Sequence, residues 1–266
     1  MNLKESRILV ANDDGIHAEG IAVLEAIARE LSDDVWVVAP ESEQSGAGHS
    51  LTMHEPLRMR QIDERHFAVK GTPTDSVLVA SMEIMKDKQP DLVLSGVNRG
   101  CNLAEDVTYS GTVAAAMEGT LLGIPSIAMS LGFITDAPVQ WDTPRHFGAD
   151  IVRQLTSVGW DDGNLINVNF PNIPVDQVQG IKVCPQGRRK IEEKLEKRHD
   201  PKGRPYFWIG GPGTEAYNDL PGADYTQVQK GFITITPLQL DLTNYKLLEE
   251  IREQFETTDE RLTATV

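Results

Sequence analysis

The stretch that decides the fold is Arg7-Ile8-Leu9-Val10-Ala11-Asn12-Asp13-Asp14-Gly15-Ile16, an apolar run that ends in three oxygen-bearing side chains and a glycine. A short β-branched run of this kind is typical of a strand buried on both faces of a parallel sheet. The following residues show helical apolar spacing at Ile21, Leu24, Ile27, Ala28 and Leu31. The acidic residues are therefore expected at the carboxyl end of a first strand, the edge where α/β sheets bind ligands.

Asp13 and Asp14 are the first candidate site residues. At the end of a strand, with Gly15 free to turn the backbone, two adjacent carboxylates can converge. Their mutual repulsion raises one pKa strongly unless a cation lies between them, and Mg²⁺ or Mn²⁺ is a common solution. The alternative is that Asn12, Asp13 or Asp14 only caps a helix beginning near Ile16. Capping accounts for one of the three residues, so both interpretations stay open at this point.

The overall charge limits the class of partner. The chain has 266 residues, with 40 acidic against 25 basic side chains and a formal net charge of -15. This balance disfavours a nucleic-acid scaffold, but a small phosphorylated substrate can still be held locally by loops, a helix N-terminus and a metal. The length permits one large α/β domain or a domain with an appendage.

The cysteines and the N-terminus bear on location. Cys101 and Cys184 are the only cysteines and form no CxxC motif, which is expected of a protein in a reducing cytoplasm. Residues 1–6 contain no apolar signal region, and no apolar run approaches membrane-spanning length. We expect no membrane segment.

Strand and helix patterns alternate along the first two thirds of the chain. Apolar runs predict strands over 34–40, 91–94, 124–130 and 165–171, a hairpin over 57–60 and 66–69, and helices beginning at Thr72-Pro73 and over 108–118 and 144–158. This βαβ alternation predicts an α/β fold with a Rossmann-like, doubly wound, mostly parallel sheet.

Three loops at the expected carboxyl edge contain further candidates. The loop over 41–52 is polar and small enough to approach a ligand, although an ordinary connection is the alternative. Asn98 can give a neutral oxygen to a metal, and Arg99 is either a phosphate ligand or an exposed charge. Ser110-Gly111-Thr112 opens a helix whose N–H groups and hydroxyls suit an anion. Neither a P-loop nor a GxGxxG spacing is present.

The composition changes in the last third. Residues 180–203 are mixed in charge and basic-leaning, and strand-like runs follow at 206–209 and 232–237 before an amphipathic helix over 242–255. We expect a core over 1–175 and, over 176–266, a C-terminal β-arm and terminal helix for oligomerisation; a surface excursion is the alternative.

Six motifs occur in one order: Asn12-Asp13-Asp14-Gly15-Ile16, Ala39-Pro40, Ser45-Gly46-Ala47-Gly48-His49-Ser50, Gly71-Thr72-Pro73, Ser95-Gly96-Val97-Asn98-Arg99-Gly100 and Tyr109-Ser110-Gly111-Thr112-Val113. Each is weak alone, but in this order and spacing the chain closely resembles the SurE family of stationary-phase survival proteins. Members of that family are divalent-metal-dependent phosphatases of nucleoside 5'-monophosphates. The resemblance covers nearly the whole chain and is densest through about Met129.

The resemblance implies a set of site residues. The family's metal ligands correspond to Asp13, Asp14, Ser45 and Asn98, which would hold one Mg²⁺ or Mn²⁺ per subunit. It also implies a C-terminal arm and helix exchanged within a homodimer or homotetramer, and activity of some members on 3'-nucleotides and short polyphosphate. Ala11, where members often have threonine, is the one departure and involves no implied ligand.

The expected reaction is phosphomonoester hydrolysis. Asp13 and Asp14 would act through a metal that activates water, with Asn98, Ser110, Gly111 and Thr112 binding the phosphate. Direct attack by Asp13 or Asp14 is the alternative. His49 and His54 are possible acids that equally fit structural roles.

Two other classes are rivals. A phosphoryl-accepting receiver domain also places an acidic pair after its first strand, but it has about half this length. A nucleotide-binding protein without turnover is the second rival. The sequence does not fix the preferred base, the choice between 5' and 3' substrates, the metal, the oligomer size or the physiological role.

Overall fold

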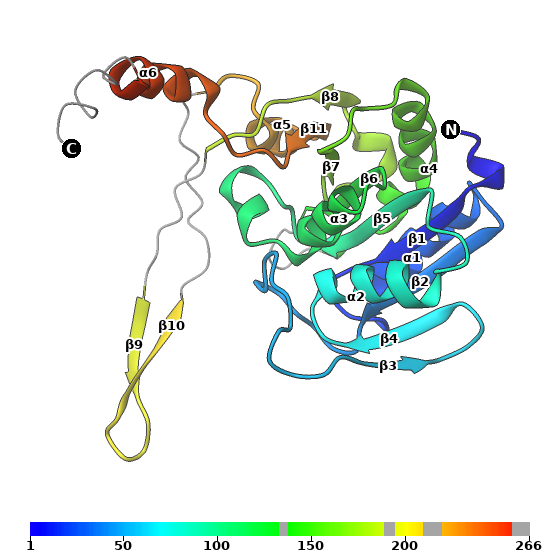
Figure 1. Ribbon diagram of the computed structural model, residues 1–266, viewed down its shortest axis with the longest axis horizontal. Coiled ribbons are helices and arrows are strands. Elements are labelled where there is room, and N and C mark those ends of the chain that lie inside the picture. The colour runs from blue at the N-terminus through cyan, green and yellow to red at the C-terminus, as the bar shows by residue number, and fades with distance from the viewer. Residues whose placement is uncertain (133–137, 189–194, 210–219, 257–266) are drawn as a thin grey trace, which may run out of the picture.

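A nine-stranded, mostly parallel sheet forms the centre of the computed structural model, which describes residues 1–132, 138–188, 195–209 and 220–256 (Figure 1). The strand order is β3-β4-β2-β1-β5-β6-β7-β11-β8, and only the β3–β4 and β7–β11 pairs are antiparallel. The strands are β1 Arg7–Ala11, β2 Asp34–Pro40, β3 Arg58–Gln61, β4 His66–Lys70, β5 Leu92–Arg99, β6 Ser126–Leu131, β7 Asn164–Phe170, β8 Ile181–Val183 and β11 Ile233–Gln239. The predicted α/β class with a mostly parallel sheet is confirmed.

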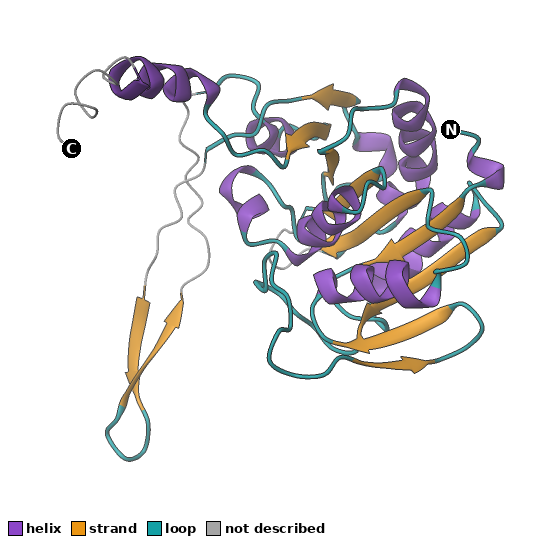
Figure 2. Cartoon of the chain, viewed as in Figure 1, coloured by secondary structure: helices purple, strands orange, loops and turns teal. Residues whose placement is uncertain are grey.

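Helices cover both faces of this sheet (Figure 2). The longer ones are α1 Glu19–Arg29, α2 Pro73–Val79, α3 Gly111–Leu121, α4 Asp142–Val158, α5 Asp224–Gln229 and α6 Tyr245–Phe255. Short turns of helix are η1 Leu3–Glu5, η2 Ala80–Ile84, η3 Ala104–Thr108 and η4 Val175–Gln177. One core cluster lies under α1 and α4, and a second lies under α2 and α3.

The first strand is the centre of the fold, as its sequence predicts. Residues Ile8 to Ala11 are fully buried, and β1 pairs in parallel with β2 on one side and β5 on the other. Helix α1 buries Ile21, Leu24 and Ile27, but it begins at Glu19, later than the expected Ile16. The difference arises because the residues before it form a tight turn, described below.

Local signals elsewhere are also confirmed. The hairpin β3–β4 forms, and Thr72 and Asp75 make a reciprocal capping box at the start of α2, with Pro73 at its first position. The predicted end of the next strand, before Ser95, is wrong. Strand β5 continues to Arg99, and its pairing with β6 is irregular between Ser95 and Asn98. At Gly96, φ is +132° and an added Cβ would lie 2.1 Å from the Met129 carbonyl oxygen, so glycine is needed there.

The last third of the chain contributes to two sheets. Strands β8 and β11 complete the main sheet, whereas β9 Leu195–His199 and β10 Pro205–Ile209 form a separate antiparallel hairpin. Helix α6 begins at Tyr245 instead of Leu242, and the short α5 was not predicted. Residues 189–194, within the basic-leaning stretch, lie outside the described residues. In the described part of the chain, no helix combines the length and the apolar character needed to cross a membrane.

Gly20 tests the close contact of α1 with the sheet. A Cβ at this position would lie 2.0 Å from the Val97 carbonyl oxygen and 3.2 Å from the Trp141 ring. We expect Gly20→Ala to lower the free energy of unfolding by about 1–3 kcal/mol through overpacking, measured by urea denaturation. Val158→Ala, at an exposed position in α4, should change it by less than about 0.5 kcal/mol. Equal stability of the two variants would contradict the close contact.

Candidate active site

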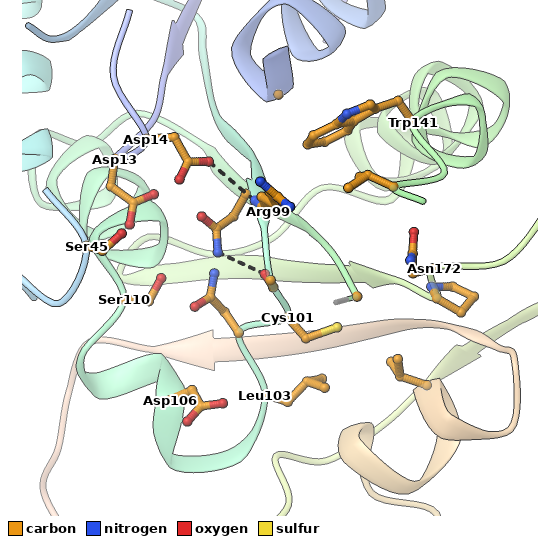
Figure 3. A pocket seen from close by; sticks show the side chains of 18 of the residues that line it. Asp13, Asp14, Ser45, Arg99, Cys101, Leu103, Asp106, Ser110, Trp141 and Asn172 are labelled. Atoms are coloured by element: carbon orange, nitrogen blue, oxygen red, sulfur yellow. Dashed lines mark hydrogen bonds between the residues drawn. The ribbon is translucent and has the colours of Figure 1, made fainter. Parts of the chain in front are cut away.

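Three loops meet at the carboxyl edge of the sheet because β1 lies between β2 and β5. Asp13 and Asp14 follow β1, Ser45 follows β2 and Asn98 lies at the end of β5. All four line one cavity of about 1740 Å³ (Figure 3). The loop after β2 is attached beside the acidic pair, since the Gln44 N–H donates to the Asp13 carbonyl oxygen over 2.8 Å. The structure thus brings together the four residues that the resemblance implies as metal ligands.

Asn12 forms the turn that directs the acidic pair. Its Nδ2 donates to the Gly15 carbonyl over 2.9 Å, and the Gly15 N–H donates to its Oδ1 over 3.2 Å. Helix α1 has Ala18 as its N-cap and no side-chain capping bond. The interpretation of Asn12, Asp13 or Asp14 as a helix cap is therefore wrong, and both carboxylates remain available to the cavity.

Asp13 is a buried carboxylate held by the start of α3. Its exposed fraction is 4%, and the Thr112 hydroxyl donates to its Oδ1. Gly111 permits this contact, because an added Cβ would lie 2.6 Å from the Asp13 Cβ. Burial raises the pKa of Asp13 to about 6; the Asp14 charge acts in the same direction, and the Thr112 hydrogen bond opposes it.

Asp14 is the more accessible of the pair. The Arg99 backbone N–H donates to its Oδ2 over 3.3 Å. Burial raises the pKa of Asp14, and the Glu43 charge adds to the increase, while the Arg99 contact opposes it. Both carboxylates therefore have raised pKa values, and a bound cation would relieve this cost.

The neutral candidates present oxygen to the same space. The Asn98 Nδ2 donates to the Gly100 carbonyl over 2.8 Å, which fixes the amide and leaves Oδ1 as its ligand atom. The Ser45 hydroxyl donates to Glu43 over 2.9 Å. Among the described residues no three His, Cys, Asp or Glu side chains are placed to hold an ion together. Two carboxylates, an amide oxygen and a hydroxyl nevertheless fit a hard divalent cation such as Mg²⁺ or Mn²⁺.

The predicted anion site lies at the beginning of α3. Ser110 is its N-cap and accepts from the Val113 N–H over 3.0 Å, and it lines the cavity. Thr112 and Gly111 contact Asp13 instead. Ser110 is therefore the member of the Ser110-Gly111-Thr112 group that borders the open space.

The remaining candidates separate into two groups. Arg99 lines the cavity (Figure 3), whereas the His49 Nε2 lies 3.0 Å from the Glu118 carboxylate in α3. His54 is exposed. His49 thus has a structural partner, and it connects the loop after β2 to α3.

Sequence reasoning missed an amide network beneath the loop that follows β5. Asn102 donates through its backbone N–H to Asn169 over 2.9 Å and through its side chain to Ser130 over 2.8 Å, while Asn167 donates to the Asn102 carbonyl over 2.7 Å. These groups are buried, so their bonds fix the loop near Asn98. The available signal was the two buried asparagines, Asn167 and Asn169, among the apolar residues of β7.

The fold and the site together define an α/β protein with a cluster of oxygen-bearing side chains lining a cavity at the carboxyl edge of its sheet. Residues 8–193 match the family described as Survival protein SurE, and the chain belongs to this family. It is 55% identical over 249 residues to the 5'-nucleotidase SurE of Paramagnetospirillum magneticum, covering 94% of this chain and 95% of the relative.

Two further comparisons agree. The 5'-nucleotidase SurE of Erythrobacter litoralis is 53% identical over 252 residues, covering 94% of this chain and all of the relative (100%). The crystal structure of the SurE protein from Aquifex aeolicus has a TM-score of 0.82 and 43% identity, covering 93% of this chain and 99% of the other. Family membership removes the receiver domain as a rival.

The raised pKa of Asp13 gives a prediction for the protein in chelator. Its folded-state pKa of about 6 exceeds the ordinary 3.8, so stability is lost as the pH rises from about 4 to about 6. We expect Asp13→Asn to unfold at a higher urea concentration than wild type at neutral pH, with a gain of about 1–3 kcal/mol.

This gain should vanish below about pH 4, where Asp13 is protonated in both states. At neutral pH, added Mn²⁺ should stabilise wild type and leave the stability of the variant unchanged. A gain that is independent of pH, or a variant less stable than wild type at neutral pH, would contradict the burial of an uncompensated charge.

Proposed function

We propose that this protein is a divalent-metal-dependent phosphatase that hydrolyses nucleoside 5'-monophosphates to nucleoside and inorganic phosphate. The observation that carries the proposal is the convergence of Asp13, Asp14, Ser45 and Asn98 on one cavity beside the N-terminus of α3. The names of the close relatives, 5'-nucleotidase SurE, support the same reaction.

A metal is part of the proposal for an electrostatic reason. A phosphate dianion that approaches two carboxylates is repelled, and burial strengthens the repulsion. One Mg²⁺ or Mn²⁺ per subunit, held by Asp13, Asp14, Ser45 and Asn98, would offset the negative charge of the carboxylates, so that the site attracts the phosphate. When bound, such a cation also polarises phosphate oxygens and lowers the pKa of a water molecule that serves as nucleophile.

The chain's own groups orient the reaction. Thr112 and the Arg99 backbone N–H hold the two carboxylates in place. Ser110 at the positive end of α3 would stabilise charge on the transferred phosphoryl oxygens, while Gly111 and Thr112 act through their contact with Asp13. Asn98 lines the same cavity and is proposed to contact both metal and phosphate.

The size of the cavity supports a substrate larger than phosphate. The space extends from Asp13 to Trp141 and Asn172 on the far side (Figure 3). A phosphate placed at the acidic end therefore leaves room for a nucleoside. Nucleoside 3'-monophosphates and short polyphosphate are proposed as further substrates on the family resemblance alone. A cytoplasmic location is proposed because the sequence has two cysteines and no CxxC motif.

The decisive measurement is release of inorganic phosphate from a panel of 5'- and 3'-mononucleotides with Mn²⁺, Mg²⁺ or chelator. We expect release to require metal and to fall in Asp13→Asn by about 100-fold or more, because a central electrostatic contact is lost. Asp142→Asn, an exposed acid in α4, is the matched control and should retain wild-type activity. Undiminished release in chelator would reject the proposal, and so would metal-dependent binding without turnover.

We further propose that residues 1–175 provide the catalytic core and that 176–266 provide an arm and helix exchanged between subunits of a homodimer or homotetramer. Hairpin β9–β10 exposes Leu195, Phe207, Trp208 and Ile209, and α6 exposes Ile251 and Phe255. Apolar surface of this extent on two C-terminal elements is typical of an interface.

Light scattering during size-exclusion chromatography tests this assembly. Wild type should elute with a mass that is a multiple of the 29.4 kDa chain. The double substitution Phe207→Ser and Trp208→Ser should lower that mass, since it removes two aromatic anchors. Met82→Ser, which changes an exposed residue in η2, should leave it unchanged. A monomeric wild type would refute the assembly.

A further inference from the structure

The loop after β2 contains a carboxylate with no role in the reaction described so far. Glu43 lines the cavity together with Asp13, Asp14 and Ser45. Its Oε1 accepts the hydrogen bond from the Ser45 hydroxyl, at a distance of 2.9 Å. Ser45 is the one hydroxyl among the proposed ligands, so the position of its proton bears on the site.

A serine hydroxyl binds a cation only through its lone pairs. Its O–H bond rotates freely unless an acceptor fixes it, and a proton directed at the cation opposes binding. A carboxylate is the strongest side-chain acceptor for such a proton. With the proton held on Glu43, the Ser45 lone pairs are directed to the other side of the oxygen. Supporting contacts of this kind commonly determine how well a ligand binds its metal.

Glu43 lies near the acidic pair without joining it. Burial is the main cause of the raised pKa of Asp14, and the Glu43 charge raises it further. Asp13, Asp14 and Glu43 are nevertheless not arranged to hold one ion together, since the described residues contain no such group of three. The contact through which Glu43 reaches the site is therefore its hydrogen bond with Ser45.

We propose that Glu43 is a positioning residue of the metal site, which orients the Ser45 hydroxyl so that its oxygen faces the divalent cation. The proposal rests on the metal site of the proposed function. It assigns Glu43 an effect on cation affinity that does not depend on nucleotide binding or turnover.

Direct titration with Mn²⁺, followed by electron paramagnetic resonance of the free ion, tests this role without nucleotide. We expect Glu43→Ala to weaken Mn²⁺ binding about tenfold. Glu43→Gln should restore most of the affinity, because its amide oxygen still accepts the Ser45 proton. Glu41→Ala is the matched control, since Glu41 is exposed in the same loop and pairs with Arg60 over 3.5 Å; its affinity should equal that of wild type.

A double-substitution comparison separates orientation from other effects. In a Ser45→Ala background, Glu43→Ala should cause little further loss, because the hydrogen bond has already been removed. An undiminished loss in that background would overturn the proposal in favour of direct ligation or general charge. Affinity in Glu43→Gln as low as in Glu43→Ala would overturn it as well.

The same titration distinguishes this inference from the function on which it rests. If wild type binds Mn²⁺, Asp13→Asn does not, and Glu43→Ala binds like wild type, only the role of Glu43 fails. If wild type itself does not bind Mn²⁺, the metal site fails and the inference fails with it.

Discussion

The repulsion between two adjacent carboxylates at the end of a buried strand is the constraint on which the rest of this site depends. Asp13 is almost fully buried, and Asp14 follows it directly in the chain. The Thr112 hydroxyl donates to Asp13 and the Arg99 backbone N–H donates to Asp14, whose pKa the Arg99 charge also lowers. These contacts lower the cost of placing two carboxylates together without removing it, since the pKa values of both Asp13 and Asp14 stay raised.

The parallel sheet explains why these ligands come from distant parts of the sequence. Because β2, β1 and β5 are neighbours running in one direction, the loops that follow them emerge at the same edge. Helix α3 then approaches this edge closely, and only a glycine at position 111 leaves room for Asp13. The site therefore depends on close backbone contacts as much as on its ligands.

The features that the sequence predicted correctly are those that short-range patterns determine. The buried run at β1, the helix start at Thr72-Pro73 and the hairpin β3–β4 each have a short-range signal, and each formed. The irregular end of β5 and the contact of Thr112 with Asp13 did not follow from any local pattern. Both depend on residues far apart in sequence, Gly96 against Met129 and α3 against β1, and such contacts exist only after the sheet has assembled.

The segments after residue 175 extend the main sheet and also line the cavity. Strands β8 and β11 extend the main sheet, so the exposed hairpin β9–β10 lies in the sequence between two strands of that sheet. Asp224, buried at the start of α5, accepts hydrogen bonds from the Ala104 and Gly187 N–H groups over 3.0 and 2.8 Å. Ala104 follows the loop that contains Asn98, and burial raises the pKa of Asp224. Asp224 therefore joins the start of η3, which lies between β5 and α3 in the chain, to the segment that follows β8.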